Sequence, residues 1–186
     1  REILSSVFRS QLPQIKKVEF NVETQALGEN GAPIMITQSE YMRRMKEMAN
    51  IQAGMSFYGE MPNMYNLVLN ADHKLVKQVL TDADNSCKAA LEPIESEMAS
   101  LNNRRKELQK AQEGKKTEDI PQEKKDELND IEKKISDETT KKQAVLGEYA
   151  NGNKIIHQLI DLALLQNNML KGEALTNFVK RSIELI

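Results

Sequence analysis

The sequence contains few of the residues that build metal sites and disulfides. Its 186 residues include one cysteine, Cys87, two histidines, His73 and His157, and no tryptophan. A single cysteine cannot form an internal disulfide, which favours a reducing compartment such as the cytoplasm. The two histidines lie 84 positions apart, so no short spacing of ligands predicts a metal site. We expect no metal ion in this chain.

The sequence also lacks the motifs of nucleotide-binding and hydrolytic enzymes. None of the glycines at Gly28, Gly31 and Gly114 is followed by the Lys-Ser/Thr pair of a phosphate-binding loop, and no Gly-x-Ser-x-Gly occurs. The longest apolar run, Leu162 to Leu165, is far shorter than the roughly 20 residues of a membrane span. A net charge of -2 provides no field for nucleic acid. We predict a non-enzymatic chain without a cofactor, which binds neither nucleic acid nor membrane.

Aromatic residues make up only 4% of the chain, whereas hydrophobic residues make up 39%. This composition favours a helix-rich protein with an aliphatic core over an aromatic-rich β-sandwich. The first residue is Arg1 and not Met, so we expect a fragment of a longer protein.

Charge is concentrated in the middle of the chain. Residues 82–150 hold 13 of the 26 basic and 17 of the 28 acidic residues. Apolar residues recur there at alternating spacings of three and four, which is typical of a coiled-coil seam, and the turn 114–121 ends in a proline suited to starting a helix. We predict an antiparallel helical hairpin, in which Pro93 kinks or interrupts the first helix. The predicted seam contains Leu91, Ile94, Met98, Leu101, Arg105 and Leu108, then Leu128, Ile131, Ile135, Glu138, Lys142, Val145 and Tyr149.

The first 80 residues indicate a small mixed α/β unit. A helix is expected over residues 1–12, and alternating residues predict strands over 18–22, 34–36 and 65–69. The turn 28–33 suggests that the second strand returns beside the first. Thr37 and Glu40 form a capping box for a helix that runs to about Ile51, and Asn70 with Asp72 offers an N-cap for a helix that opens at His73.

The chain closes with two helical patterns. Eight of the eleven residues from Ile155 to Leu165 are apolar, and a second helix is expected from Glu173 to Ile186 after Gly172. We expect these two helices to carry more apolar surface than one partner helix covers, which indicates association with another copy.

Methionine is clustered in one segment. Six of the nine methionines fall between Met42 and Met64, among the aromatic residues Tyr41, Phe57 and Tyr58. Flexible thioethers beside aromatic rings suit a surface that adapts to many partners. The alternative is that the stripe packs on the sheet, as amphipathic helices usually do.

Several segments, taken in order, resemble the C-terminal dimerisation domain of the bacterial heat-shock protein 90 family. They are IKKVEFNVETQAL, GAPIMIT, SEYMRRMKEM, LNADHKLVKQVL and the terminal stretch from His157. The closest motif is Leu69 to Val76, which is similar to the family's Leu-Asn-Pro-x-His-x-Leu-Val. The resemblance covers residues 1–80 and 154–186 and leaves out the charged hairpin.

The resemblance implies that the C-terminal helix pair forms half of a four-helix dimer interface. Together with the strand and hairpin patterns, this predicts an α+β fold with a three-stranded sheet and a long helical-hairpin insertion. We expect three parts: residues 1–80, the insertion 81–150 and the dimerisation helices 151–186. Family members hydrolyse ATP with magnesium in an N-terminal domain, whose motifs do not occur here. The implied dimer residues are Ile156, Leu159, Ile160, Ala163, Leu164, Leu175, Phe178, Val179 and Ile183, and the implied contacts with unfolded clients are Tyr41, Met42, Met45, Met48, Phe57 and Tyr58.

Two functions follow as hypotheses. The first is a cytoplasmic homodimerisation and client-contact domain of an ATP-dependent chaperone. The second is a coiled-coil adaptor, in which the hairpin docks a partner and the α/β part is only a platform.

Overall fold

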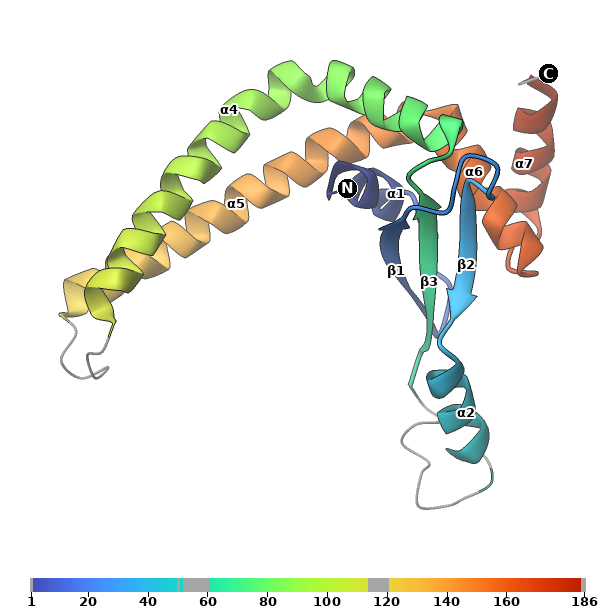
Figure 1. Cartoon of the computed structure of the whole chain (residues 1–186), viewed down its shortest axis with the longest axis horizontal. Coiled ribbons are helices and arrows are strands. Elements are labelled where there is room, and N and C mark those ends of the chain that lie inside the picture. The colour runs from blue at the N-terminus through green and yellow to red at the C-terminus, as the bar shows by residue number, and fades with distance from the viewer. Residues whose placement is uncertain (1, 50, 52–60, 114–120, 185–186) are drawn as a thin grey trace.

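The computed structural model describes residues 2–49, 51, 61–113 and 121–184. A three-stranded sheet lies beside several helices, and a long two-helix arm extends from this body (Figure 1). The predicted α+β class with a small sheet and a helical hairpin is confirmed. The second helix pair of a four-helix interface would belong to another copy, so that part stays a prediction.

The sheet consists of β1 (Val18–Gln25), β2 (Ile34–Gln38) and β3 (Asn63–Asn70), in the order β1-β3-β2. Strand β3 runs parallel to β1 and antiparallel to β2. The expected hairpin between the first two strands is therefore wrong. The last four residues of β3, from Leu67 to Asn70, are all buried, which suits a central strand covered on both faces.

The main core lies between the sheet and the helices. Helix α1 (Glu2–Ser10) contributes Leu4, Val7 and Phe8, and α6 (Lys154–Gln166) contributes its most buried face. They meet apolar side chains of the sheet such as Leu67 and Leu69. In Figure 1, α1 lies on the arm side of the sheet, next to β1, whereas α6 lies next to β2.

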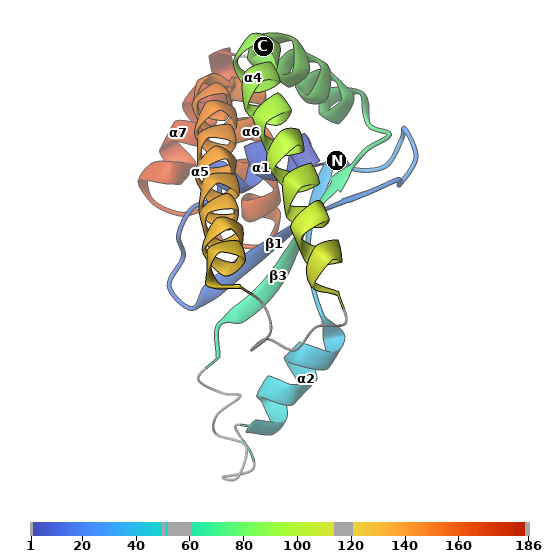
Figure 2. The ribbon, with the colours of Figure 1, turned by 90° about the vertical axis from the view of Figure 1, so that its left-hand side faces the viewer.

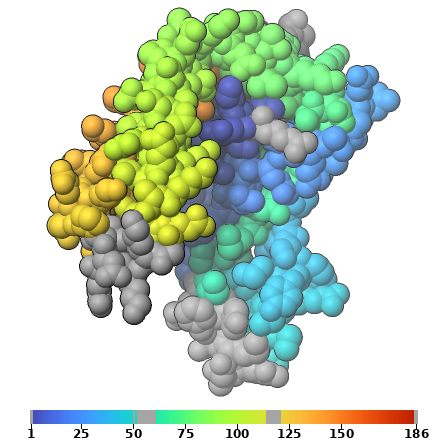
Figure 3. All heavy atoms as spheres, turned by 60° about the vertical axis from the view of Figure 1, so that its left-hand side comes forward, coloured from blue at the N-terminus to red at the C-terminus, as the bar shows by residue number. Residues whose placement is uncertain are grey.

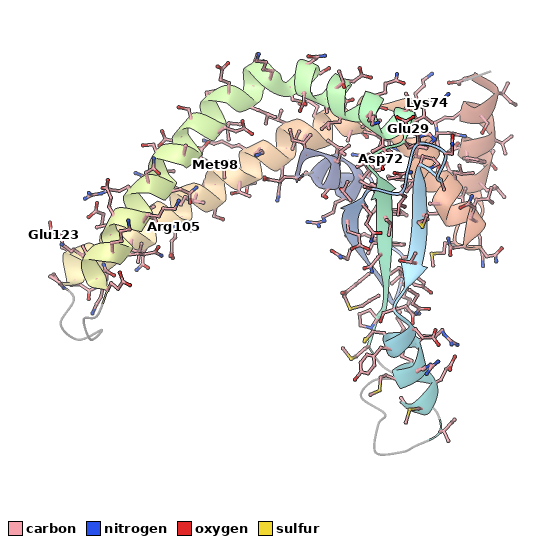
Figure 4. The ribbon with its side chains drawn as sticks, viewed as in Figure 1. Glu29, Asp72, Lys74, Met98, Arg105 and Glu123 are labelled. Carbon is pink, nitrogen blue, oxygen red and sulfur yellow. The ribbon has the colours of Figure 1, made fainter. Side chains whose placement is uncertain are left out.

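The turn from β3 into α4 (Lys74–Gln112) is held by Asn70, which is fully buried. Its amide nitrogen donates to Gly28 O at 2.8 Å, and its Oδ1 accepts from Leu27 N at 3.1 Å. The Asp72 carboxylate accepts from Gly28 N at 2.9 Å. The prediction that Asn70 and Asp72 cap the helix is wrong because both side chains bond to the loop after β1. Figure 4 shows Asp72 beside this loop, near Glu29.

The N-cap of α4 is His73 itself. Its Nδ1 accepts a hydrogen bond from Leu75 N at 3.2 Å. The predicted capping box places the N-cap two residues too early. Thr37 lies within β2, and α2 (Glu40–Ala49) starts at Glu40 itself. The N-cap position is Ser39, whose carbonyl oxygen accepts from Arg43 N at 3.0 Å, whereas Thr37 lies two residues earlier and pairs with Asn66 of β3.

The arm consists of α4 and α5 (Gln122–Gly152), which lie side by side in Figures 1 and 2. Pro93 does not interrupt α4, which continues for 39 residues. The helix curves along its length in Figure 1, as expected where proline removes a backbone hydrogen bond. The outer arm, residues 100–136, has its own small core of Leu101, Leu108 and Ile131.

The base of the arm belongs to the main core. Leu91 on α4, with Leu146 and Ala150 on α5, packs into the same cluster as α1 and the sheet. The predicted boundaries at residues 80/81 and 150/151 fall inside α4 and α5, so neither is a linker. Leu146 is buried although it lies outside the predicted seam, because α1 covers a second side of α5.

Helix α6 extends one residue beyond the predicted range 155–165 at each end, and α7 begins at Glu173 as predicted, whereas its predicted last residue, Ile186, lies outside the described residues. Asn153 ends α5 and caps α6, since its Oδ1 accepts from the backbone nitrogens of Ile155 and Ile156 at 3.0 and 3.1 Å. Gly172, with φ +61°, precedes α7 (Glu173–Glu184).

Candidate interaction surfaces

Helix α7 exposes a continuous apolar stripe. Leu175, Val179 and Ile183 follow one another at intervals of four residues, which places them along one side of a helix. Their exposed fractions are 37%, 48% and 69%, and no residue from Glu173 to Glu184 is buried. The fourth predicted dimer residue of this helix, Phe178, is half-buried against the main core. The stripe is therefore free to contact a second molecule.

The predicted dimer residues on α6 need a correction. Ile156, Leu159, Ile160, Ala163 and Leu164 are at most 4% exposed in the single chain. They pack into the main core, where α6 meets β2, α1, α4 and α5. A second copy is not needed to cover them. The apolar pattern required only that they be buried, and it did not specify which neighbour covers them.

Three polar contacts join α6 to α7. Lys154 Nζ lies 2.7 Å from Glu184 Oε2, and Gln158 Nε2 donates to Ser182 Oγ at 2.6 Å. Further along, the Arg181 guanidinium donates to the Asp161 carboxylate. Burial raises the pKa of Asp161 by more than the neighbouring Arg181 lowers it. The attraction between Asp161 and Arg181 therefore offsets only part of the free energy that the Asp161 carboxylate loses on leaving water.

Helix α2 projects beyond the sheet and carries four of the six predicted client residues (Figure 1). Tyr41 is 66% exposed and Met48 is 44% exposed, whereas Met42 and Met45 are half-buried. Figure 3 shows α2 and the arm as separate projections from the body. Burial of the whole stripe against the sheet, the alternative considered above, does not occur.

The charged side of α2 is organised by ion pairs. Arg43 bridges Glu40 at 2.9 Å and Glu47 at 2.6 Å, and Arg44 contacts Glu40 at 2.9 Å. Hydrogen bonds from Arg43 and Arg44 lower the pKa of the Glu40 carboxyl. These contacts stay on one side of the helix, so they leave the apolar side unobstructed. Lys46 anchors the helix by donating to Asn63 Oδ1 at 2.8 Å.

Sequence reasoning missed exposed apolar residues next to the predicted sets. Met64 on β3 is 42% exposed, Ile51 after α2 is 83% exposed, and Leu165 on α6 is 37% exposed. Sulfur atoms gather around α2 and the adjoining end of the sheet in Figure 4. Met64 could have been identified from the alternation along β3, which places it on the other face of the strand from the inward-facing residues. The predicted client residues Phe57 and Tyr58 lie outside the described residues, as does Met55.

Within the described ranges, no helix combines the length and apolar character needed to cross a bilayer. The same ranges contain no group of three or more His, Cys, Asp or Glu side chains placed to hold a metal ion.

Comparison with known proteins covers the entire chain, including the arm. The chain is 68% identical to Chaperone protein HtpG of Bacteroides fragilis and 65% identical to Chaperone protein HtpG of Bacteroides thetaiotaomicron, each over 186 residues. It is 43% identical over 188 aligned residues to Chaperone protein HtpG of Porphyromonas gingivalis. No family model and no solved structure matches the chain.

These relatives are named as chaperones, and the match to them extends over all 186 residues. Over its whole length the chain is similar to a segment of these chaperones, which confirms the resemblance drawn from its motifs. It spans 27% of the length of each relative, about a quarter of a full chaperone. The charged arm, which lay outside the resemblance, is shared with these relatives because the alignments run through it.

Proposed function

We propose that this chain is the C-terminal dimerisation and client-contact domain of a cytoplasmic, ATP-dependent chaperone of the heat-shock protein 90 family. The observation that carries the proposal is the exposed stripe of Leu175, Val179 and Ile183 on the last helix. Apolar side chains arranged in a continuous row gain most from a partner that removes them from water.

A second copy of the chain is the occupant that the proposal assigns to this stripe. In a two-fold symmetric dimer the same patch faces itself, so one row of apolar side chains serves both partners. The α6–α7 pairs of two copies would then form a four-helix arrangement. ATP hydrolysis would take place in other parts of the full chaperone, and this chain would hold the two copies together.

The dimer is tested by sedimentation equilibrium of the 186-residue chain. We expect the double variant Val179→Glu with Ile183→Glu to shift a dimer to a monomer at micromolar concentration, because charge opposes burial of the stripe. The control Asn177→Glu with Lys180→Gln changes the net charge equally at exposed positions of the same helix. Equal association of both variants, or a monomeric unaltered chain, would reject the proposal.

The client surface is assigned to the apolar side of α2. Tyr41, Met45 and Met48 share this side and line a projecting helix instead of a core. We expect Met45→Ser with Met48→Ser to weaken binding of an unfolded polypeptide several-fold and to leave the dimer intact. Met45→Leu with Met48→Leu keeps the apolar area and should bind as the unaltered chain does. Serine variants that bind equally well would refute the assignment.

The adaptor hypothesis remains the second candidate because the outer arm has a small core of its own and stands away from the body. Under that hypothesis the arm would bind a partner through its charged surface. Removal of the outer arm therefore separates the two functions.

A further inference from the structure

Helix α7 has little apolar contact with the body of the protein. Of the residues from Glu173 to Glu184, Phe178 alone packs against the main core. The apolar stripe of Leu175, Val179 and Ile183 is exposed instead of facing α6. Burial of apolar area therefore does little to fix the rotation of α7 about its own axis.

Polar contacts provide the remaining restraint. Lys154, Gln158 and Asp161 lie at intervals of four and three residues, so they form one row on α6. They meet Glu184, Ser182 and Arg181 in reverse order, which matches two antiparallel helices. The three contacts together specify which side of α7 turns toward α6.

These contacts differ in how much geometry they impose. The Lys154–Glu184 pair is exposed on both sides, at 61% and 55%, and pairs of this kind contribute little. Arg181 and Asp161 are only 22% and 18% exposed. A desolvated guanidinium–carboxylate pair has a strong preference for one orientation.

The same pair is a poor source of stability. Among the described residues, Arg181 Nε and the neighbouring Gln158 Oε1 are buried polar atoms without a hydrogen-bond partner. Loss of hydration thus offsets much of the attraction between the charges, as is common for ion pairs removed from water. A contact that is specific in direction and small in net energy selects a geometry without strengthening the fold.

The geometry points to Asp161 and Arg181 as positioning residues that set the rotation of α7 on α6 and so aim the apolar stripe at the second copy. The inference rests on the proposed dimer. Neither residue contacts the partner, and both act through the orientation of Leu175, Val179 and Ile183.

The test separates orientation from stability. In Asp161→Leu with Arg181→Met, both charges are replaced by apolar side chains, which avoids leaving one charge unpaired. We expect the dimer dissociation constant, measured by sedimentation equilibrium, to rise about tenfold, within the range found for coupled contact pairs. The midpoint of urea unfolding, measured where all chains are monomeric, should stay unchanged or increase.

Two further variants complete the test. The reversed pair, Asp161→Arg with Arg181→Asp, should recover most of the lost affinity because it restores the contact with opposite polarity. Lys154→Met with Glu184→Leu removes the exposed pair and should change the dissociation constant less than about twofold.

The outcomes are distinct. A dimeric unaltered chain with an unchanged dissociation constant in the apolar double variant overturns the inference and leaves the proposed function standing. A reversed pair as weak as the apolar double variant also overturns it. An unaltered chain that stays monomeric overturns the proposed dimer, and the inference fails with it.

Discussion

The Lys142 ammonium lies 3.0 Å from the Glu95 carboxylate, across the two helices of the arm. It also lies 3.4 Å from the carboxylate of Glu2, although only 13% of the Lys142 side chain is exposed. One lysine thus joins α5 to both α4 and α1 at the point where the arm meets the body. Lysine at a predicted seam position is explained by these two acidic partners.

We predict that Lys142→Met lowers the free energy of unfolding by about 0.5–1 kcal/mol, because two ion pairs of a largely buried lysine are lost while the Glu2 and Glu95 carboxylates, 79% and 50% exposed, stay hydrated. Urea denaturation measures this change. Lys141→Met is the matched control, since Lys141 is 62% exposed and its ion pair with Glu138 lies within the same helix. An equal loss in both variants would contradict the assigned role.

The same lysine makes stability depend on pH. Burial lowers the pKa of Lys142, but the Glu95 and Glu2 carboxylates raise it by more, so the net shift is upward from 10.5. A raised lysine pKa stabilises the fold below the unfolded value, and this contribution is lost as pH rises through the folded pKa. We expect the difference in unfolding free energy between the unaltered chain and Lys142→Met to be constant near neutrality and to shrink above pH 10.5.

Asn153 joins two helices through both ends of its amide. Its oxygen caps α6, and its nitrogen donates to the Tyr149 hydroxyl at 2.9 Å. We predict that Asn153→Ala costs about 1–2 kcal/mol of unfolding free energy, the usual range for a lost cap. Asn151→Ala, at an exposed position two residues earlier, should cost less than about 0.5 kcal/mol in the same denaturation experiment.

The two terminal helices should respond differently to truncation. Leu159→Ala should lower the unfolding free energy of the monomer by about 2–5 kcal/mol, because it leaves a cavity in the main core. Ile183→Ala should change it by less than about 0.5 kcal/mol, because that side chain is 69% exposed. Both are measured by denaturation at a concentration where the chain is monomeric. Similar losses would mean that α7 is packed more tightly than its exposure indicates.

Removal of the outer arm should leave the body folded. The Glu95–Lys142 and Arg104–Glu127 ion pairs indicate a register that brings residues 99 and 137 side by side. We predict that replacing residues 100–136 by a short Gly/Ser turn keeps cooperative unfolding and the dimer, because Leu91 and Leu146 of the main core remain. Circular dichroism and sedimentation measure both properties.

The shortened chain also distinguishes the two functional hypotheses. Retained client binding supports the chaperone domain. Loss of binding to a partner that recognises the intact chain supports the adaptor. An unfolded shortened chain would contradict the division into an outer arm and a main core.

Local signals predicted most helix ends. Pro121, Asn153 and Gly172 act through short-range geometry, and α5, α6 and α7 begin next to them. Prediction failed where a residue had a partner distant in the sequence. Asn70 had the character of a cap but bonds to the loop at Gly28, 42 residues earlier, so His73 takes the cap position.

The surfaces show the same division. Spacing correctly grouped Tyr41, Met45 and Met48 on one side of a helix, since helical geometry alone determines this. Whether that side faces the sheet or solvent depends on where α2 projects from β2, and the exposure of Tyr41 and Met48 became evident only in the folded chain.

The order of residues was sufficient to indicate a charged helical hairpin, an amphipathic methionine helix and two apolar terminal helices, because periodicity and helix caps are local properties. Tertiary structure decided that β3 is the central strand and that Leu159 is covered within its own chain while Ile183 remains exposed. Leucine and isoleucine prefer burial equally at both places. The distinction arises because sheet and helix neighbours from distant parts of the chain surround α6 on several sides and leave the apolar stripe of α7 uncovered.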